Sequence, residues 1–232
     1  MSAVDDLLTS IFDERKPDFY REFEGWIRNS RRYMAFAQTY HTKIRAKLKN
    51  ARDENGLKDL RAELETAALL LRDQRFTVEY ETYAASRHRG PDFTVTFKTH
   101  TPFNVEVRRV RATELDDAET EVRVLKLVAV LCDKVGQMPP SIVNLLWLTA
   151  EREVLSDDLT KAATTTRQLA ERKVEDFFVR RGFDSAADFL KQFQRMSGIV
   201  LHQSTANTVW LNSLARHKVS PEIVAAIRRL TN

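Results

Sequence analysis

Two acidic residues and an arginine on consecutive predicted strands have the types and spacing that could support chemistry. Asp92 opens one strand, and Glu106 and Arg108 lie two residues apart on the next. Side chains two residues apart on a strand share a face, so Glu106 and Arg108 point the same way. If the connecting hairpin is centred near His100, Asp92 lies opposite Arg108 and beside Glu106.

The convergence of two carboxylates predicts a cation between them. Close like charges are costly unless a positive group neutralises them, and carboxylate oxygens are the usual ligands of hard divalent cations. Asp92 and Glu106 are therefore the expected ligands of Mg²⁺ or Mn²⁺. The alternative is an exposed hairpin in which Glu106 and Arg108 form an incidental neighbouring pair, because surface ion pairs contribute little.

The segments GPDF (90–93) and VEVR (105–108) resemble the PD-(D/E)XK nuclease-like superfamily, whose motif is an Asp at one strand and Glu-x-Lys on the next. The helix AELETAALLL (62–71) resembles the preceding helix of that family and offers Glu63. The resemblance covers residues 56–150. It implies an α/β fold with a mixed sheet flanked by helices, a restriction-endonuclease-like core, and a metal-dependent nuclease with Glu63, Asp92, Glu106 and Arg108 as catalytic residues.

Arg108 departs from the family pattern, which has lysine at this position. Arginine stays protonated and cannot act as a base, although it binds phosphate in bidentate fashion. Lys98 or Lys126 could supply the lysine. The sequence thus predicts a weak or degenerate nuclease, whose cleavage Arg108→Lys would raise, or an inactive protein of this fold that binds nucleic acid or acts as a scaffold.

The elements that must position these residues follow from hydrophobic periodicity. Helices are expected over residues 3–14, 17–52, 57–72, 117–135, 157–181, 185–193 and 221–230. The helix over 17–52 either breaks near Asn29-Ser30 or spans the domain. Strands are expected over residues 76–80, 93–97, 103–107, 142–148, 198–201 and 208–211, with a loop at 84–91. We interpret residues 1–55 as an N-terminal helical extension packed on the core and residues 56–232 as the PD-(D/E)XK-like α/β domain.

A basic run is the strongest sign of a partner. Residues 25–52 contain no Asp or Glu but many Lys and Arg, a distribution that can follow a phosphate backbone. The predicted contacts to DNA or RNA are Lys43, Arg45, Lys47 and Lys49. The alternative is an ordinary solvated helix face. A third hypothesis, an interaction module using the helix at 17–52, leaves the carboxylates unexplained.

Other conspicuous side chains are interpreted as core. Trp26, Tyr33, Phe36 and Tyr40 could stack on bases, but their helical spacing favours burial. Cys132 lies on an apolar helix face, which favours a buried residue over a nucleophile. The histidines, among them His88, lack metal-ligand spacing.

Composition excludes several classes of protein. The 232 residues are 43% hydrophobic and 30% charged with a net charge of +4, which indicates a globular chain. The single cysteine forms no intramolecular disulfide, and no apolar run approaches the ~20 residues of a membrane span. Without a signal-peptide pattern we expect a cytoplasmic protein with no membrane partner. Homo-oligomerisation is left open.

Overall fold

The computed structural model describes residues 2–83, 90–111, 120–151, 154–203 and 206–230. Most of the loop expected at 84–91, including His88, lies outside these ranges, as does the expected helix start at 117–119.

Helices and strands follow one another much as the periodicity predicts. The helices described are α1 (Ala3–Phe12), α2 (Tyr20–Asn29), α3 (Arg31–Asn50), α4 (Glu54–Arg72), α5 (Thr120–Val135), α6 (Ser156–Glu171), α7 (Glu175–Val179), α8 (Ala186–Phe193) and α9 (Pro221–Arg228). The strands described are β1 (Phe76–Tyr80), β2 (Phe93–Phe97), β3 (Thr101–Val110), β4 (Val143–Ala150), β5 (Gly198–Gln203) and β6 (Ala206–Leu211).

The six strands form one mixed sheet in the order β1-β2-β3-β4-β5-β6. Strands β1, β2 and β3 are successively antiparallel, β3, β4 and β5 are parallel, and β6 is antiparallel to β5. The two parallel steps need crossovers, which α5 and the α6–α8 segment provide. The predicted mixed sheet flanked by helices is therefore confirmed.

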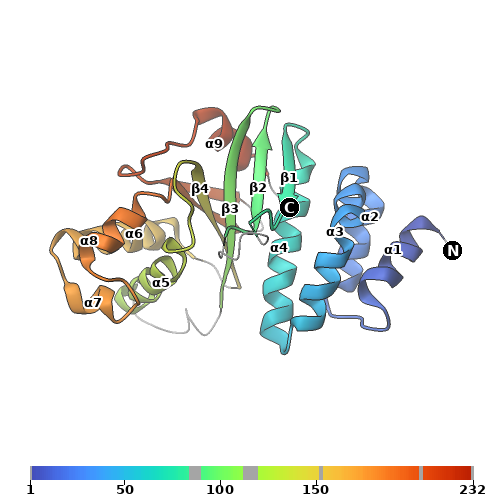
Figure 1. Cartoon of the computed structure of the whole chain (residues 1–232), viewed down its shortest axis with the longest axis horizontal. Helices are drawn as coiled ribbons and strands as arrows, with labels where there is room; N and C mark the ends of the chain where they lie inside the picture. Colours follow the sequence, from blue (N-terminus) through green and yellow to red (C-terminus); the bar gives the residue numbers. More distant parts are fainter. Residues whose placement is uncertain (1, 84–89, 112–119, 152–153, 204–205, 231–232) are drawn as a thin grey trace.

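Helices cover both faces of the sheet, with α5–α8 on one side and α1–α4 on the other (Figure 1). Buried residues of α1–α4, α9, β1 and β2 belong to one apolar cluster, and those of α5, α6 and α8 belong to a second. The division into an extension of residues 1–55 and a domain of residues 56–232 stays a prediction. None of the helices described has the length and apolarity that a membrane span requires.

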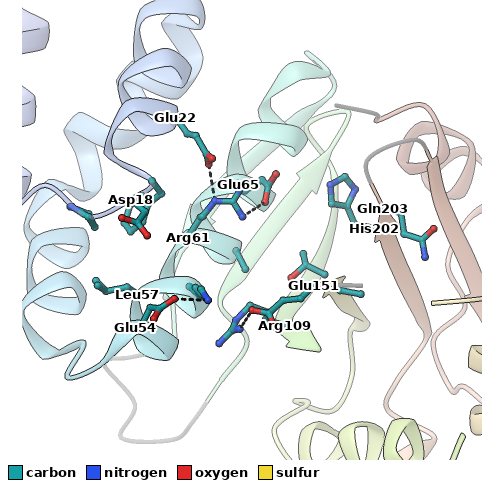
Figure 2. Close-up of a pocket in the computed structure, with 16 residues that line it drawn as sticks. Asp18, Glu22, Glu54, Leu57, Arg61, Glu65, Arg109, Glu151, His202 and Gln203 are labelled. Carbon is teal, nitrogen blue, oxygen red and sulfur yellow. Dashed lines mark hydrogen bonds and ion pairs between the residues drawn. The ribbon is translucent and has the colours of Figure 1, made fainter. Parts of the chain in front are cut away.

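Arg109 fixes the far end of β3 to its surroundings. Its side chain is only 6% exposed, and Nε donates to Asp59 Oδ1 on α4 at 2.8 Å. Nη1 donates to Glu151 after β4 (Figure 2), and Nη2 donates to Asn55 Oδ1 on α4 at 3.0 Å. The guanidinium thus ties together α4, β3 and the end of β4.

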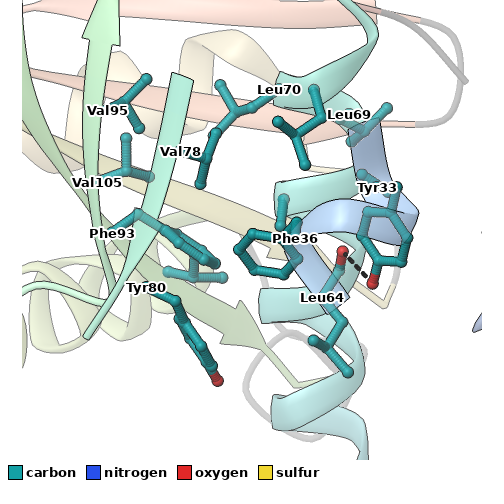
Figure 3. Packing of buried hydrophobic residues seen from close by; sticks show 14 of the residues in the cluster. Tyr33, Phe36, Leu64, Leu69, Leu70, Val78, Tyr80, Phe93, Val95 and Val105 are labelled. Carbon is teal, nitrogen blue, oxygen red and sulfur yellow. Dashed lines mark hydrogen bonds between the residues drawn. The ribbon is translucent and has the colours of Figure 1, made fainter. Parts of the chain in front are cut away.

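The helix α3 packs directly on the sheet. The Phe36 ring lies 6.0 Å from that of Tyr80 and 6.5 Å from that of Phe93, and Tyr33 Oη donates to the carbonyl of Leu64 (Figure 3). The interpretation of the α2–α3 aromatics as core is confirmed. Tyr33 and Phe36 are buried, and Trp26 and Tyr40 pack against the same cluster.

Two helix boundaries test the sequence analysis. The expected break near Ser30 is confirmed, because the Ser30 hydroxyl accepts from the Tyr33 amide and caps α3. The continuous helix expected over 157–181 is wrong. The chain leaves the helix after Glu171, and Lys173 adopts a φ of 55°, a left-handed conformation incompatible with a continuing α-helix.

The core supplies a stability prediction. Leu70 of α4 is fully buried, so Leu70→Ala should lower the free energy of unfolding by about 2–5 kcal/mol through lost burial and a residual cavity. Leu125→Ala on α5 is the matched control, because that leucine is 52% exposed. Urea denaturation measures both. Equal losses in the two variants would contradict the assigned packing.

Candidate functional site

Four carboxylates converge where β2 begins. Glu63 comes from α4, Glu81 follows β1, Asp92 precedes β2 and Glu106 lies on β3. The β2–β3 register pairs Phe93 with Val105, so the next step outward sets Asp92 opposite Glu106. Strand β2 has not yet begun at this level, and Asp92 Oδ2 accepts from the Val107 amide of β3 at 2.8 Å. The Asp92 side chain therefore takes the place of a strand partner.

Lys47 of α3 binds three of these carboxylates. Its Nζ lies 2.6 Å from Glu63 Oε2, 2.9 Å from Glu81 Oε1 and 3.8 Å from Asp92 Oδ1. The ammonium also lies over the Tyr80 ring, 4.9 Å from its centroid. One cation from the N-terminal helices thus neutralises side chains from three other parts of the fold.

Glu106 is neutralised from the opposite helical layer. It is only 4% exposed, and Lys134 Nζ of α5 donates to its Oε1. Its Oε2 is buried and has no hydrogen-bond partner within the described part of the chain. Buried polar atoms are nearly always paired, so this oxygen is an available ligand position.

The loop that carries Glu81 is held in a rare conformation. Glu81 has a φ of 50°, which non-glycine residues seldom adopt. Its amide donates to the Asp92 carbonyl at 2.8 Å, and Lys43 Nζ donates to the carbonyls of Tyr80 and Glu81. These bonds fix the Glu81 carboxylate beside Lys47.

Burial raises the pKa values of Glu63, Asp92 and Glu106. Burial and then repulsion from Asp92 raise the pKa of Glu63 to about 7, although Lys47 and the Tyr80 hydroxyl act in the opposite direction. Burial and repulsion from Glu106 raise the pKa of Asp92 to about 7. Burial also raises the pKa of Glu106, against the attraction of Lys134. For Lys47, attraction to the carboxylates outweighs burial and raises its pKa.

The structure brings together Glu63, Asp92 and Glu106 but changes their expected relation to Arg108. The hairpin pairs Phe97 with Thr101, which centres it on Thr99 instead of His100, so Asp92 faces Glu106. Arg108 shares the face of Glu106, and its Nη1 donates to the Arg109 carbonyl. It lines a cavity together with Lys134.

The predicted substitute lysines lie elsewhere. Lys98 Nζ pairs with Glu222 on α9 at 2.7 Å. Lys126 precedes Lys134 by eight residues, about 12 Å along α5 at the usual helical rise.

The four predicted nucleic-acid contacts on α3 do not form one free surface. Lys43 donates to the backbone carbonyl of Tyr80, and Lys47 pairs with Glu63. Arg45 Nη2 lies 3.4 Å from Asp13 Oδ2. Lys49 is exposed.

Sequence reasoning missed Lys134, Glu81 and the Tyr80 hydroxyl, and it gave Lys47 a different role. The Tyr80 hydroxyl donates to Glu63 Oε2 at 2.5 Å. Glu81 could have been found, since it follows a strand that ends beside Asp92. Cys132 is buried, which confirms the core interpretation, and burial raises the pKa of its thiol to about 12.

No protein-family model, curated protein or solved structure matches this chain. Within the described ranges, no three or more His, Cys, Asp and Glu side chains are grouped so as to hold a metal ion. The site is therefore characterised by its own geometry, a set of four carboxylates bound to two lysines.

The raised pKa values predict a pH-dependent stability. Glu63 ordinarily titrates near 4.5 but at about 7 in the folded chain, so the folded state binds this proton more tightly than the unfolded state. Unfolding free energy should consequently fall as pH rises from about 5 to 7, because each pKa unit corresponds to about 1.4 kcal/mol.

Glu63→Gln removes the titrating carboxyl group. The unfolding free energy of this variant, measured by urea denaturation, should therefore decrease less between about pH 5 and 7 than that of the natural chain. Glu65→Gln on the same helix is the control and should keep the slope of the natural chain. An unchanged slope in Glu63→Gln would contradict the assigned environment.

Proposed function

We propose that this chain is a metal-dependent phosphodiesterase with a PD-(D/E)XK-like site that acts on DNA or RNA. The observation that carries the proposal is the convergence of Glu63, Asp92 and Glu106 at one edge of the sheet. They come from the helix before the sheet and from two adjacent strands, in the order α4-β1-β2-β3-α5-β4. That order fits the restriction-endonuclease-like core that the sequence resembles.

The carboxylates fit a divalent cation as a pair. Asp92 and Glu106 face each other, and Glu106 Oε2 is buried without a partner. Their raised pKa values mean that a nearby positive charge would be strongly favoured. Mg²⁺ or Mn²⁺ held by Asp92 and Glu106 would supply a nucleophilic hydroxide and neutralise charge at phosphorus.

Lys134 is the residue best placed to replace the lysine that position 108 lacks. Its ammonium already donates to Glu106, whereas the Arg108 guanidinium donates to a backbone carbonyl. An ammonium beside the reacting phosphate can donate a hydrogen bond and stabilise developing negative charge. Lys47 holds Glu63 and Glu81 and so orients the acidic side of the site.

A basic cavity beside Lys134 offers a place for the phosphate backbone. Its volume is about 580 Å³, and it lies between the end of β3, α5 and the segment after α7. Its cationic lining residues outnumber the acidic ones. The cationic residues are Arg108, Arg111, Lys134 and Arg181, and the acidic ones are Asp59 and Asp133. Arginine and lysine in this arrangement favour phosphate oxygens.

A second candidate function is an inactive protein of the same fold that binds nucleic acid or acts as a scaffold. The observation that favours it is the internal neutralisation of the acids. Lys47 and Lys134 already occupy positions where a metal would place its charge. Metal affinity and cleavage distinguish the two candidates.

The catalytic proposal predicts Mn²⁺-dependent cleavage of plasmid DNA or single-stranded RNA. Asp92→Asn and Glu106→Gln should abolish both cleavage and Mn²⁺ binding measured by calorimetry. Lys134→Met should slow cleavage by about 10²–10³-fold, the usual cost of removing a donor that stabilises developing charge.

Arg108→Lys is the control that separates the two cationic positions, and it should change the rate little if Lys134 has this role. Wild-type protein that neither binds Mn²⁺ nor cleaves would support the inactive candidate. Cleavage that survives Asp92→Asn would place the reaction elsewhere.

The basic cavity predicts where nucleic acid binds. Arg181→Glu should lower affinity for a fluorescent oligonucleotide and reduce the slope of log K against log salt by about one, because a phosphate contact is lost. Lys49→Glu is the matched charge reversal on exposed α3. A loss in Lys49→Glu alone would instead assign binding to α3, as the basic run in the sequence predicts.

A further inference from the structure

A second cavity lies on the α4 side of the sheet, away from the acidic site. Its volume is about 710 Å³, within the usual range for small-molecule sites. Its walls are the segment from Pro17 to Glu22 and the first three turns of α4, and its floor is the ends of β3, β4 and β5 (Figure 2). Ligands of α/β proteins commonly bind at the carboxyl ends of parallel strands.

A row of polar side chains crosses the floor. Arg109 pairs with Thr149 in the β3–β4 register, and Thr149 pairs with His202 in the β4–β5 register. All three line the cavity. The Thr149 hydroxyl is buried and has no hydrogen-bond partner in the described part of the chain.

His202 offers a hydrogen-bond acceptor to the cavity. Asn207 Nδ2 donates to the carbonyls of Ile227 and Leu230, which leaves its Oδ1 to accept from His202 Nδ1 at 2.7 Å. The proton of the neutral ring therefore lies on Nδ1, and Nε2 carries a lone pair. His202 is only 6% exposed, and no contact to its Nε2 is found among the residues described.

The charges of the lining select a positively charged ligand. The three lining cations all pair with carboxylates: Lys58 with Glu54 at 2.6 Å, Arg61 with Glu22 at 2.7 Å and Glu65 at 3.7 Å, and Arg109 with Glu151 (Figure 2). The lining contains five carboxylates, namely Asp18, Glu22, Glu54, Glu65 and Glu151. An anion would meet this excess of negative charge with the cations already paired, whereas a cation would be attracted.

We infer that this cavity binds a small organic cation, an aliphatic guanidinium or ammonium compound, whose N–H groups donate to His202 Nε2 and whose charge faces the carboxylates. Leu57, Phe19 and Ala150 line the same cavity and provide apolar surface for its aliphatic part. The inference is independent of the proposed nuclease function, because none of Lys47, Glu63, Asp92, Glu106 and Lys134 lines this cavity.

The test titrates the full chain with agmatine, which carries a guanidinium and an ammonium, and follows the histidine ring nitrogens by ¹⁵N NMR together with calorimetry. Agmatine should shift the His202 Nε2 resonance saturably. His202→Gln and Asp18→Asn should each weaken binding by about tenfold or more, as expected when a charge-assisted contact is lost. Asp18 is exposed, so Asp18→Asn leaves folding intact.

Three controls separate this site from other effects. His217→Gln changes an exposed histidine and should bind agmatine like the natural chain. Glu106→Gln should also bind it normally, so a failed nuclease proposal leaves this result unaffected. Succinate, a dianion without a cationic group, should not bind. The inference is overturned if agmatine shows no saturable binding up to about 10 mM, if succinate binds equally, or if both His202→Gln and Asp18→Asn retain full affinity.

Discussion

The neutralisation of buried carboxylates by Lys47 is the interaction on which the candidate site depends. A buried charge without a partner costs several kcal/mol, and three acids here share one ammonium. Lys47 lies on α3, while its partners lie on α4, after β1 and before β2. The N-terminal helices are thereby part of the site, and a change in how α3 packs on Phe93 and Tyr80 would move the charge at its centre.

The place of the site follows from unequal strand lengths. Strand β2 begins at Phe93, but its neighbour β3 continues beyond this level to Val110. The edge of β3 exposed by this step needs partners, since unpaired backbone groups are costly when buried. Asp92 supplies one by accepting from the Val107 amide, and the Arg109 network joins the rest of the edge to α4. Lys134 of α5 binds Glu106 from one helical layer, and Glu63 of α4, in the other layer, helps to raise the pKa of Glu106.

The local sequence pattern predicted the strands and the positions of the acidic residues. The turn and the lysine partners depend on backbone conformation and on contacts between residues distant in the sequence. Alternation placed Asp92 at the first position of a strand, one residue before β2 begins, and Glu106 on β3, because strand periodicity is strict. The predicted turn was misplaced because Lys98 and Thr99 adopt positive φ angles of 50° and 70°. Neither residue type indicates such a conformation from the sequence. Lys47 was interpreted as a nucleic-acid contact because the basic run contains no acid, and its partners are distant in the sequence. Lys134 was missed because only the packing of α5 determines which of its lysines reaches Glu106.

The charge balance of the site links its protonation to its occupancy. Four carboxylates meet two ammonium groups, and burial together with repulsion from a neighbouring acid raises the pKa values of Glu63 and Asp92 to about 7. Protons and Lys47 therefore occupy the positions for which a divalent cation must compete. If the proposed divalent cation binds, it displaces these protons, and its affinity should rise with pH through the range in which the carboxyls ionise. Whether the proposed metal can bind depends on the free energy of displacing the carboxyl protons and the Lys47 ammonium group.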